Sequence, residues 1–463
     1  MLFTTFKLAP DYNSSKEAYL LTRRQFVGSA AAPIALMAAT TRPNLLLILT
    51  DQQTHNALSC AGNRWLKTPA MDSLAASGLR FTQTICAYPV CSPSRSSIFT
   101  SRMPHETGVR NNAKAILTGM PTMGEIFRDA GYKTVYGGKW HLPKSFDGMT
   151  GFEKLVGGSA LGKDMDAPLS SACAKWLLAA PAEPFLMVAS FMNPHDICDW
   201  IRQHEGNQDY PNVSSYPPVP TNVAVDPAEP ECIQYHRTAG YDLMSQAVGI
   251  AAKWRDADVR KYLHDYYRMV EEVDRQIGIV LAALREKQLD KNTIILFASD
   301  HGEGMCGHRW AQKAAFYEET VRVPMIINGP GIRKGVDHKS LASLIDILPT
   351  FCDYAGIHPP KDIRGTSLRP ATKGQPLKRA YAVSELRYAD ETREGRMLRT
   401  THYKYVVFNG GARPEQLFDL IADAGETRNL ALDQAAHQIL RRHRDLLREW
   451  ITKTNDDFVI PVS

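Results

Sequence analysis

The chain has 463 residues, of which 44% are hydrophobic and 22% are charged. This composition is typical of a globular protein that is long enough for one large core and a smaller second unit. The formal net charge is +5, of which residues 1–40 carry +2, so the remainder carries only +3. A general nucleic-acid-binding protein needs a denser basic surface, and we therefore exclude nucleic acid as a partner.

Residues 1–40 are predicted to be an export signal and not part of the fold. Arg23 and Arg24 precede Phe26 and a mild apolar run that ends at Ala39. The run is short of the roughly 20 residues of a membrane span, so no stable membrane span is expected. This order of features resembles a twin-arginine signal, which the twin-arginine export machinery reads as an address. We expect an exported, periplasmic protein; the alternative is a disordered tail with a chance pair of arginines.

Eight cysteines are spread along the chain, and none belongs to a Cys-x-x-Cys pair. A zinc knuckle or a thioredoxin-type redox site is therefore not expected. Most of these cysteines are predicted to be small buried hydrophobic residues. Cys91 is the exception, because of the residues that follow it.

Continuous apolar runs alternate with helical patterns from residue 44 onward. The runs are typical of strands buried on both faces of a largely parallel sheet, and they cover residues 44–50, 134–136, 185–191, 293–298 and 324–327. Helical patterns occur at residues 122–130, 170–178 and 256–287. This alternation predicts a doubly wound α/β domain, assigned to residues 41–377. The stretch from about 195 to 230 is expected to form loops, which often carry substrate contacts.

The pattern changes from about Lys378 onward. Four short strand candidates and a final helical pattern cover residues 381–384, 395–399, 403–408, 415–419 and 434–454. Residues 378–463 are therefore predicted to form a smaller antiparallel α+β subdomain.

Polar side chains follow four of the predicted strands, at the point where each strand ends. They are Asp51, Lys139, His141, His195, Asp300 and His301. Ligands of an open parallel sheet bind at the carboxyl ends of its strands. One such residue is explained by an ordinary hydrogen bond in a loop, but four strand ends together predict a functional site.

Asp51, Gln52, Asp300 and His301 are candidate metal ligands. Three oxygen-donating side chains and one imidazole suit Ca²⁺, with Mg²⁺ or Mn²⁺ as alternatives, better than a thiolate-bound zinc ion. The alternative is that both aspartates cap the helices after their strands. That role would not require the neighbouring Gln and His.

The segment from Cys91 to Arg95 reads Cys-Ser-Pro-Ser-Arg. Ser92 followed by Pro93 predicts a helix N-cap with proline as the first helical residue, and this places Cys91 just before the helix. Arg95 returns to the same end one turn later. A cation beside Cys91 indicates either a thiolate nucleophile or an oxyanion site. The Cys-x5-Arg phosphatase loop is excluded, because Ser97 holds the position of its arginine.

Cys-x-Pro-x-Arg resembles the maturation signature of type I sulfatases, which have an alkaline-phosphatase-like α/β fold. The resemblance extends from about residue 42 to 450. Other segments that resemble the family are residues 42–51, 138–142, 299–303, 312–313, 316–324, 417–420 and 425–430.

The resemblance implies that a formylglycine-generating maturation enzyme oxidises Cys91 to formylglycine. The hydrated aldehyde would present one hydroxyl to the metal and to the sulfur atom of the substrate. Its second hydroxyl would allow sulfate to be expelled, which a serine could not do. Asp51, Gln52, Asp300 and His301 would hold the cation together with residue 91.

The resemblance also implies roles for the basic residues. Arg95 would steady the hydrated aldehyde, and Lys139 and Lys313 would bind sulfate oxygens as charge builds up. His141 would assist the release of enzyme-bound sulfate. His195 would protonate the departing alcohol, with Lys313 as the competing proton donor.

Two positions depart from the usual sulfatase pattern. Many members have a second aspartate where this chain has Gln52, and many have Asn where it has His301. Gln removes a negative charge, and His shifts the preference towards softer cations. The Asp-His pair also occurs in relatives that hydrolyse phosphonate or phosphate esters.

These features predict a sulfatase that acts on a sulfated glycan or a sulfated small molecule. Carbohydrate sulfates are the first expectation, and choline or aryl sulfates remain open. The alternatives are a phosphonate monoester hydrolase or phosphodiesterase on the same scaffold, and a non-catalytic protein that binds sulfated glycans. Candidate substrate contacts, each equally explained as an ordinary loop residue, are Trp200, Arg202, His204 and His236.

Overall fold

The computed structural model describes residues 42–142, 151–158, 161–204, 209–240 and 242–461. By their contacts, residues 42–463 form one compact unit. The predicted export signal lies outside the described residues and stays a prediction. Among the described helices, none is long and apolar enough to cross a membrane.

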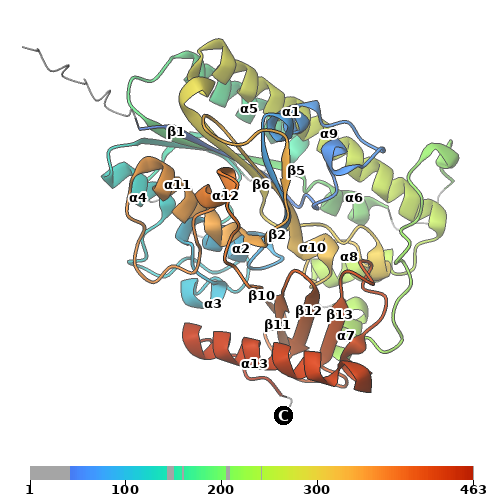
Figure 1. Ribbon diagram of the computed structural model, residues 1–463. Coiled ribbons are helices and arrows are strands. Elements are labelled where there is room, and N and C mark those ends of the chain that lie inside the picture. The colour runs from blue at the N-terminus through green and yellow to red at the C-terminus, as the bar shows by residue number, and fades with distance from the viewer. Residues whose placement is uncertain (1–41, 143–150, 159–160, 205–208, 241, 462–463) are drawn as a thin grey trace, which may run out of the picture. The chain divides into compact units, whose positions relative to one another are not determined.

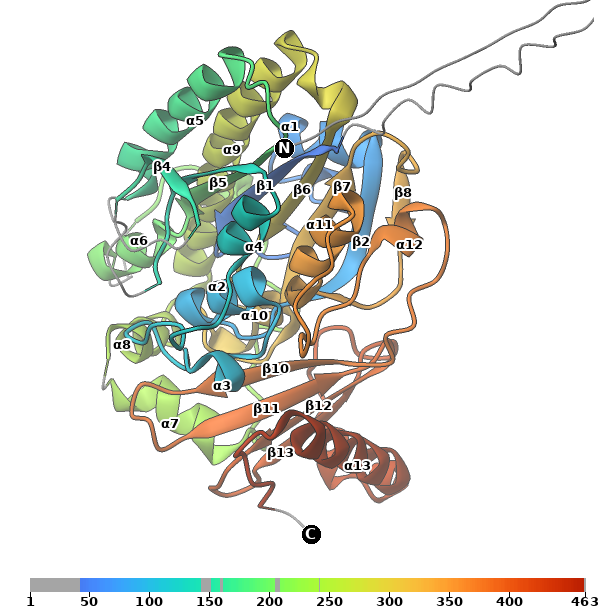
Figure 2. The same ribbon diagram turned by 90° about the vertical axis from the view of Figure 1, so that its left-hand side faces the viewer.

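A nine-stranded sheet forms the centre of this unit (Figures 1 and 2). Its strands follow the order β4-β3-β5-β1-β6-β7-β2-β8, and β9 pairs with β2. Strands β3, β5, β1 and β6 are parallel neighbours, whereas β7 is antiparallel to β6. The prediction of a largely parallel sheet is confirmed. The bounds are β1 Asn44–Asp51, β2 Gly78–Ile85, β3 Lys133–Gly138, β4 Glu153–Val156, β5 Phe185–Pro194, β6 Thr293–Ser299, β7 Arg322–Asn328, β8 Val336–His338 and β9 Ala342–Ser343.

The central strand β1 is buried on both faces. Leu45, Leu47 and Leu49 belong to one hydrophobic cluster, and Leu46 and Ile48 belong to another. Successive side chains of a strand point to opposite faces, so a continuous apolar run must be covered on both sides. Each fully buried leucine or isoleucine contributes about 1.5–3 kcal/mol.

Helices cover both faces of the sheet (Figures 1 and 2). On one face lie α1 Pro69–Ala76, α5 Gly162–Leu178 and α9 Asp256–Glu286, whose apolar residues pack on Leu46 and Ile48. On the other face lie α2 Cys91–Thr100, α4 Met123–Asp129 and α11 Ile347–Ala355. The remaining helices are α3 Pro104–Thr107, α6 Ile197–Gln203, α7 Glu231–Ala239, α8 Leu243–Ala251, α10 Glu318–Val321 and α12 Arg369–Thr372.

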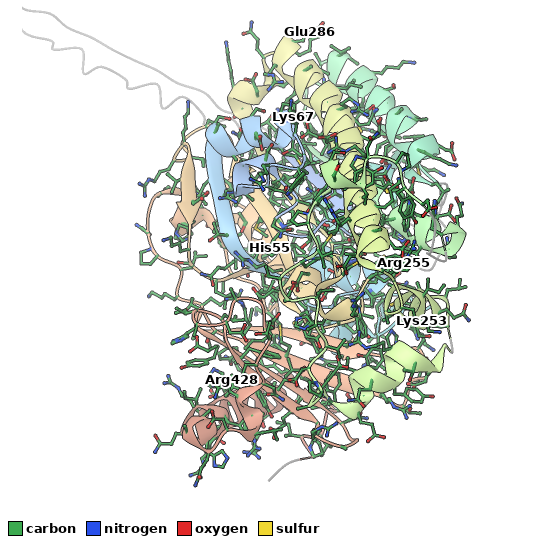
Figure 3. All side chains as sticks on the ribbon, turned by 90° about the vertical axis from the view of Figure 1, so that its right-hand side faces the viewer. His55, Lys67, Lys253, Arg255, Glu286 and Arg428 are labelled. Carbon is green, nitrogen blue, oxygen red and sulfur yellow. The ribbon has the colours of Figure 1, made fainter. Side chains whose placement is uncertain are left out.

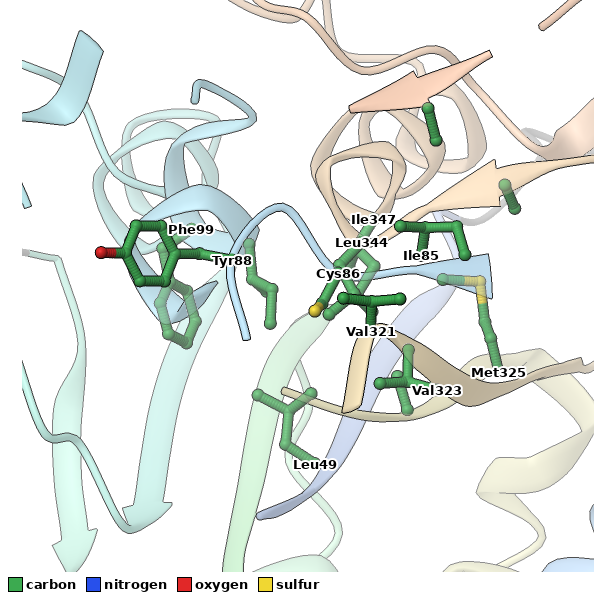
Figure 4. Packing of buried hydrophobic residues seen from close by; sticks show 14 of the residues in the cluster. Leu49, Ile85, Cys86, Tyr88, Phe99, Val321, Val323, Met325, Leu344 and Ile347 are labelled. Atoms are coloured by element: carbon green, nitrogen blue, oxygen red, sulfur yellow. The ribbon is translucent and has the colours of Figure 1, made fainter. Parts of the chain in front are cut away.

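Packing on the α2 side joins elements that are distant in the sequence. Figure 4 shows Leu49 of β1, Phe99 of α2, Val323 of β7 and Ile347 of α11 in one cluster. The buried side of α2 thus fixes its position against the sheet, and with it the position of Cys91.

Strand β2 is an element that the sequence pattern did not reveal. It pairs antiparallel with β7 and parallel with β8. Its residues Arg80, Thr82 and Gln83 are only partly buried, so the segment lacks the continuous apolar run that identified the central strands.

The C-terminal part contains a second, four-stranded antiparallel sheet, as predicted. Its elements are β10 Ala382–Arg387, β11 Glu394–Arg399, β12 Tyr403–Phe408, β13 Glu415–Asp419 and α13 His437–Thr454. Helix α13 packs Leu440 and Leu447 on this sheet in a separate hydrophobic cluster. The boundary between residues 377 and 378 stays a prediction, because the contacts join both sheets in one unit.

Charged residues at the surface come from well-separated parts of the chain. Figure 3 shows Lys67 ahead of α1, Lys253 and Arg255 ahead of α9, and Glu286 at the last residue of α9. All four side chains are exposed, as is Arg428 beyond β13.

A buried ion pair ties α3 to the second sheet and predicts a pH-dependent stability. His105 Nδ1 lies 2.6 Å from Glu385 Oε1, and its Nε2 lies 3.1 Å from the Thr454 carbonyl. Burial alone lowers the pKa of His105, but Glu385 outweighs it and raises this pKa to about 9. The stabilisation is therefore complete below pH 6.5 and lost as the pH rises through 9.

We expect the melting temperature of wild-type protein to exceed that of His105→Gln most strongly near pH 6. The difference corresponds to at most about 3 kcal/mol and shrinks above pH 9. Thermal denaturation of both proteins from pH 6 to 10 measures it. A difference that does not change with pH would show that the charge of His105 has no stabilising role.

Candidate active site

Four neighbouring strands carry the predicted site residues to one edge of the sheet. Asp51 is the last residue of β1, and Lys139, His195 and Asp300 follow β3, β5 and β6. These strands are adjacent and parallel in the order β3-β5-β1-β6. Side chains that lie up to about 250 residues apart in the chain therefore meet at one place, as the strand ends predicted.

Cys91 is the first residue of α2, and Val90 is the extended N-cap. The predicted cap at Ser92 is wrong, because Ser92 already lies inside the helix and its Oγ donates to the carbonyl of His141. The helix thus starts two residues earlier than the Ser-Pro pair indicated. Cys91 is completely buried, at the edge of the sheet where β1 and β6 end.

Three cationic or imidazole groups surround the sulfur of Cys91. His301 Nε2 and Lys313 Nζ each lie 3.1 Å from Sγ, and Lys139 Nζ lies 3.6 Å away. Asp51 Oδ1 is 3.7 Å from the same atom. Burial alone raises the pKa of the Cys91 thiol, but Lys139, Lys313 and His301 outweigh it and hold this pKa well below its usual value. The surroundings therefore stabilise negative charge at this point.

Arg95 lies behind the two aspartates. Its guanidinium donates to Asp51 Oδ2 at 2.9 Å and to Asp300 Oδ2 at 2.8 Å. It also donates to the carbonyl of Lys139 and to Ser190 Oγ, both at 2.8 Å. A planar guanidinium that binds both carboxylates fixes their orientation, so the contacts of Arg95 hold the edge of the site together.

Four side chains form a potential metal site. Ligand atoms of Asp51, Cys91, Asp300 and His301 all lie within 4.8 Å of one another. Burial, followed by repulsion from Asp51, raises the pKa of the Asp300 carboxyl to about 6. Two buried carboxylates in this proximity repel each other, and a divalent cation would relieve the repulsion. The donor set fits such a cation.

Gln52 is also buried at this edge, with a positive φ of 68°. Its Oε1 accepts hydrogen bonds from Lys313 Nζ at 3.0 Å and from Cys198 Sγ at 3.3 Å. The ammonium group of Lys313 thus bridges the amide oxygen of Gln52 and the sulfur of Cys91. The backbone N–H of Gln52 donates to Asp300 Oδ1 at 3.2 Å.

Two further histidines flank Cys91. His195 is half-buried, and burial followed by the charges of Lys139 and Lys313 lowers its pKa to about 4. Its side chain lies close enough to Cys91 for the two groups to interact. His141 is exposed, has a positive φ of 51° and also interacts with Cys91. The structure thus brings together every residue that the sequence nominated for catalysis.

The candidate substrate contacts are engaged within the fold. Trp200 stacks on His204 at 4.1 Å and donates its indole N–H to Asp265. His236 stacks between Trp310 and Tyr388. Arg202 pairs with Asp199 at 3.1 Å. These contacts explain the four side chains as packing and surface residues, and a contact with substrate stays a prediction.

Sequence reasoning missed several residues around the site. They are Ser190, Cys198, Tyr262, Glu303 and Gln312. Glu303 and Gln312 lie in segments that resemble the family, next to residues that were nominated. Ser190 lies within β5, and Cys198 and Tyr262 lie in the first turns of α6 and α9. At these positions no local signal separates a hydrogen-bonding residue from an ordinary buried one.

Known protein families match most of this chain. The Sulfatase family model matches residues 43–357, and a model described as N-sulphoglucosamine sulphohydrolase, C-terminal, matches residues 306–453. The chain belongs to the sulfatase family. It is a sulfuric ester hydrolase with an alkaline-phosphatase-like fold.

Relatives of this sulfatase match it over nearly their whole length. The Delta 4,5-hexuronate-2-O-sulfatase of Bacteroides thetaiotaomicron is 33% identical over 452 residues, which cover 92% of each chain. The solved structure of a 2-O GAG sulfatase is 31% identical, with a TM-score of 0.84, and the match covers 91% of this chain and 95% of that one. A phosphonate monoester hydrolase of Agrobacterium radiobacter shares the fold, at 21% identity and a TM-score of 0.73, over 89% and 96% of the two chains.

Proposed function

We propose that this sulfatase hydrolyses a sulfate ester of a carbohydrate to the alcohol and inorganic sulfate. The observation that carries the proposal is the environment of Cys91, in which Lys139, Lys313 and His301 surround a buried side chain. Such preorganised positive charge stabilises the negative charge that develops on a sulfuryl group during its transfer.

Residue 91 carries the nucleophile in this proposal. A maturation enzyme oxidises Cys91 to formylglycine, whose hydrated form supplies one hydroxyl for attack and a second for the release of sulfate. The atom at the Sγ position of Cys91 stands in for an oxygen of that group. Lys139 and Lys313, whose ammonium groups already approach this position, bind the sulfate oxygens.

A divalent cation completes the site. Asp51, Gln52, Asp300 and His301 hold it, together with residue 91, and Ca²⁺ is the first candidate, followed by Mg²⁺ and Mn²⁺. The cation supplies Lewis-acid stabilisation of negative charge. Arg95 orients the carboxylates of Asp51 and Asp300 from behind, in addition to the effect of its charge on residue 91.

A carbohydrate substrate is supported by the named relatives. One is a hexuronate-2-O-sulfatase and another a 2-O GAG sulfatase, and both match this chain at more than 30% identity. We therefore place sulfated uronic-acid sugars first among the substrates. We further propose that the twin-arginine signal at residues 1–40 directs the protein to the periplasm, where such sugars would reach it.

The function is tested with protein co-expressed with a formylglycine-generating enzyme. The sample is incubated with 2-O-sulfated uronate disaccharides, with 6-O-sulfated hexosamines and with an aryl sulfate, and free sulfate is measured. We expect release from at least one sugar. If only the aryl sulfate is hydrolysed, the proposal of a carbohydrate substrate is wrong, whereas the sulfatase activity itself is supported.

Removal of the cation is expected to abolish turnover and to lower the melting temperature. A ligand that binds only the native state stabilises it by about 2.7 kcal/mol when its concentration is 100 times its Kd. Chelation followed by addition of Ca²⁺, Mg²⁺ or Mn²⁺ identifies the cation that restores both properties. An active preparation that contains no metal by elemental analysis would rule out the metal site.

A second candidate function is favoured by the Asp300-His301 pair, which resembles phosphonate and phosphate ester hydrolases. The ratio of kcat/KM for an aryl sulfate and for a matched aryl phosphodiester distinguishes the two activities. A ratio below one would identify a phosphodiesterase that uses the same nucleophile. A sample that contains formylglycine, binds metal and turns over neither substrate would instead identify a protein that binds sulfated glycans.

A further inference from the structure

A buried carboxylate lies behind Gln52, on the side away from Cys91. Glu303 follows the Asp300-His301 pair and is completely buried. Its Oε2 accepts a hydrogen bond from Gln52 Nε2 at 2.6 Å. Its Oε1 accepts from the hydroxyl of Tyr262 at 2.7 Å and from the backbone N–H of Gln312. All three partners donate to Glu303.

An amide side chain has a donating end and an accepting end, so its neighbours decide which way it faces. Because Glu303 accepts, the nitrogen of Gln52 faces Glu303 and the oxygen faces Lys313 and Cys198. The reversed amide would place its oxygen against a carboxylate and its N–H groups against an ammonium. Both contacts would be repulsive in a buried environment.

The same carboxylate also holds the chain next to Lys313. Gln312 has a positive φ of 73°, and its backbone N–H is fixed by Glu303. Glu303 therefore acts on both sides of the 3.0 Å hydrogen bond that joins Lys313 to Gln52. Tyr262, near the start of α9, anchors Glu303 in turn.

We propose that Glu303 is a positioning residue, which fixes the direction of the Gln52 amide and thereby presents its oxygen to Lys313 and to the cation site. The catalytic consequence rests on the proposed function, whereas the orientation itself does not. This assignment also explains why residue 52 is a glutamine. A carboxylate of the same length at residue 52 would face Glu303 directly.

The polarity of the contact can be reversed without a change in net charge. In Gln52→Glu, two carboxylates oppose each other. In Glu303→Gln, the new amide has only one accepting oxygen for three donors, so its N–H group opposes the N–H group of Gln52. In the double variant, the amide at residue 303 donates to the carboxylate at residue 52 and still accepts from Tyr262 and Gln312. All hydrogen bonds are restored.

The experiment is a double-mutant cycle with three measurements: melting temperature, Ca²⁺ affinity by calorimetry, and kcat/KM for an aryl sulfate. We expect Glu303→Gln to weaken Ca²⁺ binding and kcat/KM by about tenfold or more, and each single variant to lower the melting temperature. The double variant should recover most of the melting temperature and bind Ca²⁺ at least about tenfold more tightly than additive effects allow. The binding and thermal measurements test the proposal even if the aryl sulfate is not turned over.

Glu415→Gln is the matched control. Glu415 accepts a hydrogen bond from Tyr405 at 2.6 Å in the second sheet, much as Glu303 does from Tyr262. This variant should lower the melting temperature without a change in kcat/KM per folded molecule, and Gln52→Glu should not rescue it. Additive losses in the Gln52/Glu303 cycle would overturn the proposal. So would wild-type Ca²⁺ affinity in Glu303→Gln, or a double variant that does not fold.

Discussion

Cys91→Ala is expected to lower turnover of every sulfate ester by at least about 10⁴-fold, because the variant has no nucleophile. The fold should persist, since α2 is held by Phe99 and its neighbours in the hydrophobic cluster and not by the thiol alone. Cys91→Ser keeps one hydroxyl but lacks the second, so it should perform at most a single turnover.

The measurement combines intact-protein and peptide mass spectrometry with a sulfate-release assay. In wild-type protein, the peptide that contains residue 91 should be lighter by the difference between a thiol and an aldehyde. Circular dichroism and metal content control for folding in Cys91→Ala. Sustained turnover by this variant would contradict the proposed nucleophile.

His195→Ala is expected to reduce turnover of an alkyl or sugar sulfate by about 10²–10⁴-fold. The effect on a nitrophenyl sulfate should be much smaller, because a phenolate of low pKa leaves without a proton. The position of His195 beside Cys91 and after β5 allows this role. The kcat values of both substrates, measured side by side, give the leaving-group dependence.

Lys313→Ala is the competing variant, because Lys313 Nζ lies only 3.1 Å from Cys91 Sγ. If Lys313→Ala shows the leaving-group dependence and His195→Ala loses the same activity on both substrates, Lys313 is the proton donor. His141→Ala should slow both substrates alike, since His141 is proposed to serve the release of sulfate from the enzyme. Intact mass should then reveal a sulfated enzyme.

The local pattern of the sequence was sufficient for the central strands and for the residue types of the site. The run from Leu45 to Leu49 is apolar on both faces, which only a doubly covered sheet accommodates. Asp51 and Asp300 stand at the ends of such runs, so the sequence predicted their position at the edge of the sheet. The sequence did not predict the weakly apolar strand β2 or the start of α2 at Cys91, because neither depends on local propensity alone.

The sequence by itself therefore determined the family, the mostly parallel α/β architecture and the residues that the strand ends deliver. Only the tertiary structure decided which of these residues are in contact. It shows that Arg95 binds both Asp51 and Asp300, and that Glu303 accepts from the Gln52 amide and so orients its oxygen towards Lys313. The physical reason is that a buried polar group must find a partner wherever packing places one. For Gln52 and Glu303 that partner lies some 250 residues away along the chain, and no local pattern encodes it.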